Sequence, residues 1–91
     1  MKGQIPWRVV SVRAEPGFRL LVHFIDGTQG EVDMSRMING TRAGVFTVLR
    51  DPTLFEQVFL DHAVVTWPGE LDLAPDAMYD AIKAEGRWVL E

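Results

Sequence analysis

Within residues 18–34, apolar residues recur at every second position on both sides of Asp26-Gly27, and this pattern limits the fold more than any other. Before the dipeptide, these positions are Phe18, Leu20, Val22 and Phe24. After it, they are Gly30, Val32 and Met34. The opposite face is mixed before the dipeptide, with Leu21 and Ile25, and polar after it. A period of two is typical of strands that place one face on a core. The segment therefore predicts a β-hairpin.

The register of this hairpin follows from the requirement that both apolar faces lie on the same side. A two-residue loop would pair Leu20 with Asp33 and set a polar face beside an apolar one. A three-residue loop over residues 25–27 pairs Leu20 with Val32 and brings the apolar faces together. We therefore predict a type I turn in which Gly27 is left-handed and forms a G1 bulge.

Turn-forming residues divide the rest of the chain into short elements. The predicted elements are a strand at 7–13, a turn at 15–17, a loop or irregular turn at 35–44, a helical turn at 44–50, a turn at 53–56, one strand from Val58 to Trp67 and a last helix with Pro75 in its first turn and Gly86 after its end. On the first strand, alternation places Val9 on one face and both Val10 and Val12 on the other.

The last helix carries recognisable signals at both of its ends. Pro75 suits a first helical turn, and Asp72 or Asp76 complements the positive end of the helix dipole. Gly86 suits the position that follows the helix. The apolar stripe consists of Met78, Ala81 and Ile82. We expect the apolar tail at 88–90 either to dock on the sheet or to cover a partner.

These elements predict a single α+β domain over residues 1–91, with an antiparallel sheet of four to five strands, a short central helical turn and a C-terminal helix. A chain of 91 residues with 47% hydrophobic residues can bury one modest core. The absence of cysteine excludes disulfides, thiolate zinc sites and cysteine nucleophiles. No apolar run spans a membrane, and the first residues carry no apolar signal region, so we expect a cytoplasmic protein.

Several residue groups, in a fixed order, give the chain a family resemblance. They are Trp7, Phe24-Ile25-Asp26-Gly27, Val32-Asp33-Met34, Gly44-Val45-Phe46, Asp51-Pro52, Thr66-Trp67-Pro68 and Asp72-Leu73-Ala74-Pro75-Asp76. Over about residues 7–82 the chain resembles the bacterial domain-of-unknown-function 2442 family. The chain departs from the family at Gly69-Glu70, where relatives usually carry Asn-Gly after Trp-Pro, which predicts a rebuilt turn.

The resemblance implies an α+β domain on an antiparallel sheet and brings no established catalytic or binding residues. It also implies a regulatory use, because some relatives carry an added helix-turn-helix domain. Relatives are often encoded beside a second small protein, in an arrangement similar to toxin–antitoxin pairs. By association this favours a protein that binds a partner.

Three arginines form the basic feature of a chain whose formal net charge is −4. Guanidinium groups at Arg36, Arg42 and Arg50 suit an anion or an acidic peptide. The alternative is a solvated loop with local ion pairs to Asp33 or Asp51.

Tryptophan is enriched at the centres of protein interfaces, and Trp7 and Trp88 lie near the two ends of the chain. They form a partner site or a homodimer face, or they pack on each other and close the sheet. We name four candidate partner-binding residues: Trp7, Arg36, Arg42 and Trp88.

Other polar groups form no recognisable catalytic or metal-binding set. His23 and His62 lack metal-ligand spacing, and strand polarity accounts for the acidic pair Glu31 and Asp33. We predict no catalytic residue, metal or cofactor.

The leading hypothesis is a non-enzymatic protein-interaction or regulatory module, the partner-binding member of a toxin–antitoxin-like pair. The alternative is a small-ligand-binding or enzymatic domain that uses the Arg36/Arg42 loop together with His23 or the strand carboxylates. Nucleic-acid binding ranks last because the chain is acidic overall. We expect a protein partner, which includes a second copy of the chain paired through edge strands. We expect no association with a membrane.

Overall fold

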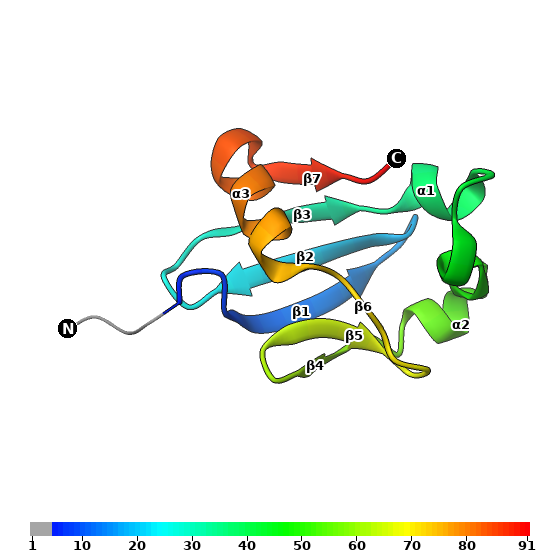
Figure 1. Ribbon diagram of the computed structural model, residues 1–91, viewed down its shortest axis with the longest axis horizontal. Coiled ribbons are helices and arrows are strands. Elements are labelled where there is room, and N and C mark those ends of the chain that lie inside the picture. Colours follow the sequence, from blue (N-terminus) through cyan, green and yellow to red (C-terminus); the bar gives the residue numbers. More distant parts are fainter. Residues whose placement is uncertain (1–4) are drawn as a thin grey trace.

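Two sheets and a set of short helices make up the computed structural model, which describes residues 5–91 and has an α+β fold (Figure 1). The elements in chain order are β1 (Val9–Glu15), β2 (Arg19–Phe24), β3 (Gln29–Asp33), α1 (Ser35–Asn39), the 3₁₀ helix η1 (Gly44–Arg50), α2 (Pro52–Phe55), β4 (Phe59–Asp61), β5 (Val64–Trp67), β6 (Leu71–Asp72), α3 (Pro75–Glu85) and β7 (Arg87–Val89). One sheet has the order β1-β2-β3-β7 and the other has the order β4-β5-β6. The predicted α+β class is confirmed, and the larger sheet has four strands; the second, three-stranded sheet was not predicted.

The predicted hairpin and its register are confirmed between β2 and β3. Leu20 pairs with Val32, and Val22 pairs with Gly30. The Phe24 N–H donates to the Thr28 carbonyl at 2.8 Å, and this bond closes a three-residue loop. Gly27 has a φ of +92°, as the left-handed position of a G1 bulge requires.

The prediction for the faces of β1 is wrong, because the strand contains a bulge. Its pairing with β2 shifts between Val9 and Ser11, so one extra residue is accommodated at Val10. The shift resets the alternation, and Val9 and Val12 both lie opposite buried residues of β2. Val10 is left 51% exposed.

The prediction of one continuous strand from Val58 to Trp67 is also wrong. β4 and β5 form an antiparallel hairpin whose two-residue turn is His62-Ala63. Both residues have positive φ angles, 53° and 66°, as a type I′ turn requires. Glycine and asparagine normally mark such a turn, so this one gave no signal in the sequence.

A turn at Gly69-Glu70 is predicted and is present between β5 and β6, whereas the strand β6 that follows it was not predicted. Trp67 pairs with Leu71 across a three-residue connection. Within that connection, Gly69 and Glu70 have φ angles of 93° and 67°.

Residues 35–39 are helical, so the predicted loop at 35–44 is wrong over its first half. The Asp33 carboxylate accepts hydrogen bonds from the Ser35 N–H at 3.0 Å and from the Ser35 hydroxyl at 2.7 Å, at the start of α1. At the other end, the Arg50 guanidinium donates to the carbonyls of Ile38 at 2.7 Å and Gly40 at 2.9 Å. These bonds satisfy carbonyls that a short helix leaves without partners.

The helical turn predicted for 44–50 is confirmed as η1. The turn predicted at 53–56 is a single turn of helix, α2, which begins one residue earlier. The Asp51 carboxylate accepts from the Thr53 N–H at 3.0 Å and caps α2.

Helix α3 ends as predicted, with Gly86 left-handed at a φ of 81°. Asp76 lies in its first turn, but Asp72 lies in β6, so the prediction of Asp72 as a helix-terminal acid is wrong. The apolar tail docks on the sheet: β7 pairs with β3 in parallel, with Trp88 opposite Val32. The larger sheet is therefore mixed rather than purely antiparallel.

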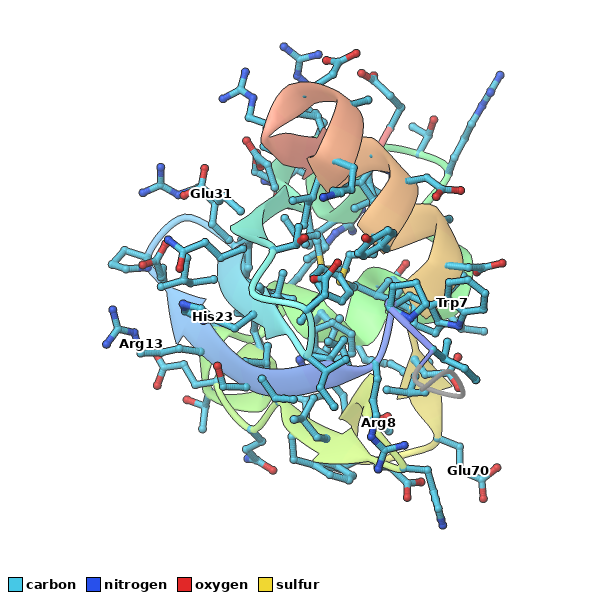
Figure 2. The ribbon with its side chains drawn as sticks, turned by 90° about the vertical axis from the view of Figure 1, so that its left-hand side faces the viewer. Trp7, Arg8, Arg13, His23, Glu31 and Glu70 are labelled. Atoms are coloured by element: carbon cyan, nitrogen blue, oxygen red, sulfur yellow. The ribbon has the colours of Figure 1, made fainter. Side chains whose placement is uncertain are left out.

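The core lies between the four-stranded sheet and the elements packed on one of its faces, and these include α3 and β5 (Figure 1). Four rings from distant segments pack edge to face or tilted at the end of this core near η1; they belong to Phe18, Phe46, Phe55 and Trp67. The other face of the sheet is open to solvent, and Arg13, His23 and Glu31 project from it (Figure 2).

Candidate partner-binding surfaces

An apolar groove lies where η1, α2 and the β5–β6 turn meet. It has a volume of about 450 Å³, and its lining residues are Val45, Val48, Leu54, Pro68, Gly69 and Leu71. Every one of these residues is apolar or glycine. We call this surface the valine groove.

The geometry of η1 explains why two valines of this groove face solvent. A 3₁₀ helix has about three residues per turn, so positions three apart lie on the same side. Phe46 and Leu49 use that spacing to face the core, and Leu49 is fully buried. Val45 and Val48 take the outer side and are 68% and 53% exposed.

The three arginines of the predicted basic loop do not gather at one place. Arg36 is exposed and lies 3.2 Å from the Glu91 carboxylate. Arg50 is committed to the carbonyls at the end of α1. Arg42 is exposed in the connection between α1 and η1. In place of the expected ion pairs, the Asp33 carboxylate accepts hydrogen bonds from Ser35 at the start of α1, and the Asp51 carboxylate accepts from the Thr53 N–H and caps α2.

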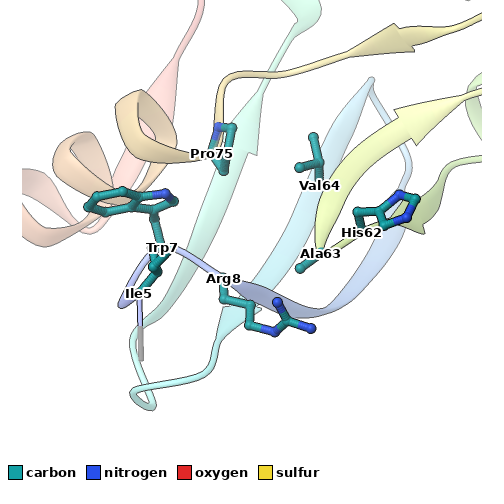
Figure 3. A pocket seen from close by; sticks show the side chains of 7 residues that line it. All are labelled: Ile5, Trp7, Arg8, His62, Ala63, Val64 and Pro75. Atoms are coloured by element: carbon teal, nitrogen blue, oxygen red, sulfur yellow. The ribbon is translucent and has the colours of Figure 1, made fainter. Parts of the chain in front are cut away.

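The two terminal tryptophans differ in their surroundings. Trp88 is half-buried in β7 and packs against the core. Trp7 is 38% exposed and lies beside Pro75 in a hollow at the start of β1 (Figure 3). Within residues 5–91 the aromatic ring pairs do not include Trp7 with Trp88. We call the hollow the Trp7 pocket.

His23 lies on the open face of the larger sheet, where its Nδ1 is 3.1 Å from the Ser11 hydroxyl. With Arg13 and Leu21 it lines a separate hollow of about 340 Å³. Neither Arg36 nor Arg42 lines that hollow, so the structure does not bring the loop arginines to His23. Across residues 5–91 no three histidines or acids cluster as metal ligands would.

One polar contact joins the β2–β3 hairpin to α3. The Tyr79 hydroxyl donates to the Asp26 carboxylate at 2.6 Å, and the Thr28 N–H donates to the same carboxylate at 2.9 Å. These hydrogen bonds lower the pKa of Asp26 from its ordinary 3.8 to about 2, and the bond from Tyr79 has the largest effect on this pKa. The same contact raises the pKa of Tyr79.

We expect Tyr79→Phe to destabilise the fold at neutral pH and to do so less as the solution becomes acidic. The interactions that lower the pKa of Asp26 stabilise the folded state fully when the pH is above 3.8, the ordinary pKa of this group. This stabilisation is lost as the pH falls from 3.8 to about 2. Urea unfolding of both proteins at several pH values measures the difference. A difference that stays constant between about pH 6 and about pH 2 would contradict this account.

Sequence reasoning missed the valine groove. The residues Val45 and Val48 were visible as an apolar pair in a short segment, but their side of the helix depends on which face meets the core. A signal was present in the spacing of Phe46 and Leu49, because filling the inner side with these two places Val45 and Val48 outside.

Comparison with known protein families gives a match over most of the chain. A family model described as "Protein of unknown function (DUF2442)" matches residues 9–84, which run from β1 through nearly all of α3. No curated protein and no solved structure matches the chain. Within residues 5–91, the helices are too short or too polar to cross a bilayer.

Proposed function

Because the chain belongs to the DUF2442 family of proteins of unknown function, its role has to be inferred from its surface, and we propose that it is a non-enzymatic protein-interaction module. In this role it is the partner-binding member of a two-protein regulatory pair of the toxin–antitoxin kind. The valine groove is the docking surface, and its occupant is an apolar segment of the partner protein.

The observation that carries this proposal is the exposure of Val45 and Val48 on a groove with an entirely apolar lining. Burying a valine side chain is worth roughly 1.5–3 kcal/mol, so leaving two exposed forgoes a substantial stabilisation. A partner that covers the groove recovers it. Contiguous apolar patches of this kind mark interaction sites on soluble proteins.

Of the two candidate arginines named in the sequence, Arg42 suits the edge of such an interface better than Arg36. Arg42 lies two residues before η1 and is exposed. Charged residues at the rim of an interface mainly speed association and select partners. We assign Arg42 that role, whereas Arg36 is engaged with Glu91.

The test is binding between this chain and the protein encoded beside it. We expect Val48→Asp to weaken the complex at least about tenfold, because a carboxylate would be buried against apolar groups. Val10→Asp is the matched control: Val10 is 51% exposed, close to the 53% of Val48, but lies on β1 outside the groove. Calorimetric titration measures the dissociation constants, and thermal unfolding checks that both variants fold.

Equal affinity of the wild-type protein and Val48→Asp would exclude the valine groove as the docking surface. Failure of the wild-type protein to bind its neighbour at micromolar concentration would overturn the pairing itself.

A further inference from the structure

The Trp7 pocket lies at the start of β1 (Figure 3), and the valine groove lies beside η1 and α2. In Figure 1 the turn before β1 and the segment of η1 and α2 lie at opposite ends of the molecule. Three segments that are distant in sequence form the pocket: the turn before β1, the β4–β5 turn and the first residue of α3. Its volume is about 110 Å³, somewhat below the ~150 Å³ of an apolar cavity that holds one benzene molecule. This is room for one side chain and not for an extended ligand.

Main-chain hydrogen bonds hold the walls of this pocket in place. The Arg8 N–H donates to the Ile5 carbonyl at 3.2 Å, and the Ile25 N–H donates to the Arg8 carbonyl at 2.9 Å. On the other wall, the Val9 N–H donates to the carbonyl of Ala63 at 3.2 Å. The pocket is therefore formed before any ligand arrives, which lowers the entropy lost on binding.

The apolar part of the surface is larger than the pocket itself. Trp7 and Ile5 line it and are 38% and 51% exposed, and Ile25, which bonds to Arg8, is 38% exposed. An exposed tryptophan beside a preformed hollow is the usual anchor point of an interface.

The permanently charged side chain that lines the pocket is basic, although the protein as a whole carries a net charge of −4. That side chain is Arg8; the imidazole of His62 also lines the pocket, and no carboxylate does. Within residues 5–91, no acid lies at ion-pair distance from the Arg8 guanidinium. Asp61 contacts the pocket residue His62 at 2.7 Å, and Asp76 accepts from the Ala77 N–H, so neither of these carboxylates pairs with Arg8.

From the size, the apolar lining and the unpaired guanidinium we infer that the Trp7 pocket binds an acidic linear peptide segment of a protein. One apolar side chain of the peptide enters between Trp7 and Val64, and a neighbouring carboxylate pairs with Arg8. This site is separate from the valine groove and does not depend on it, so the module presents one docking surface at each end.

The test uses the full chain and an array of seven-residue peptides. Each natural residue occupies the central position, flanked by glutamate, serine or lysine. We expect selection of branched or aromatic apolar residues at the centre with glutamate flanks. The best peptide, labelled with a fluorophore, should bind Trp7→Ala and Arg8→Glu at least about tenfold more weakly by anisotropy.

Matched variants show whether the peptide binds at the Trp7 pocket or elsewhere on the protein. Arg13→Glu removes a 75% exposed arginine on the open sheet face and should change the affinity less than about twofold. Arg8→Glu should move the preference from glutamate to lysine flanks. Val48→Asp should bind the peptide as the wild-type protein does.

An array without selection at the centre or the flanks would overturn the inference, as would unchanged binding by Trp7→Ala. Loss of peptide binding in Val48→Asp alone would assign the peptide to the valine groove instead. The inference therefore fails or holds independently of the proposed pairing.

Discussion

Replacing Trp67 by alanine is expected to lower the free energy of unfolding by about 3–5 kcal/mol, the cost of deleting a large buried aromatic side chain. Trp67 is fully buried on β5, and its ring packs on those of Phe55 and Phe46. Its indole N–H donates to the Phe55 carbonyl at 2.9 Å. A domain of this size has a total stability of roughly 5–13 kcal/mol, so the variant should lose a large share of it and unfold at a clearly lower urea concentration.

Two further tryptophan variants give this prediction its controls. Trp67→Phe keeps most of the apolar volume but leaves the Phe55 carbonyl without its donor, which should cost about 1–3 kcal/mol. Trp7→Ala removes a side chain that is 38% exposed and should cost much less than Trp67→Ala. Urea unfolding followed by circular dichroism measures all three. A loss below about 2 kcal/mol for Trp67→Ala would mean that β5 is not central to the core.

Gly30→Ala is expected to destabilise the fold by about 2–3 kcal/mol, although alanine is ordinarily the better residue in a strand. A Cβ at this position of β3 would lie 2.6 Å from the carbonyl oxygen of Gly86 and 2.6 Å from Cγ2 of Ile82. The carbonyl belongs to the main chain and cannot rotate away as a side chain can. The link between α3 and β7 must therefore shift.

The neighbouring position supplies the control for Gly30. Gln29 is exposed on the same strand, and Gln29→Ala should change the free energy of unfolding by less than about 0.5 kcal/mol. The source of the strain is tested by measuring the cost of Gly30→Ala in a protein that already carries Ile82→Ala, where the side-chain clash is gone and the carbonyl clash remains. The free energy lost on Gly30→Ala should be smaller in that background but should not vanish. If Gly30→Ala were as stable as the wild-type protein, the close packing of α3 on β3 would be wrong.

The two proposed docking surfaces were accessible to sequence reasoning to different degrees. Trp7 is a candidate in the sequence because tryptophan is enriched at interfaces and this one lies near a chain end, and it does line a hollow. Arg36 and Arg42 attracted attention as charges on an irregular segment, but neither lines the valine groove. The groove is built from η1, α2 and the β5–β6 turn, and no local pattern brings these three together.

Local periodicity and turn chemistry by themselves determined the β2–β3 hairpin and the ends of α3. Strand register depends on parity, so the alternation around Asp26-Gly27 admitted one loop length. Pro75 and Gly86 act on their own backbone, and the helix lies between them. Such features rest on interactions between neighbours in sequence.

Only the tertiary structure decided the features that depend on contacts between distant residues. The end of α1 is closed by Arg50, the bulge at Val10 resets a strand, and His62-Ala63 turns without glycine. The side of η1 that faces solvent follows from where Phe46 and Leu49 find the core. Packing supplies more free energy than local preference, so a weak local signal gives way wherever the two disagree.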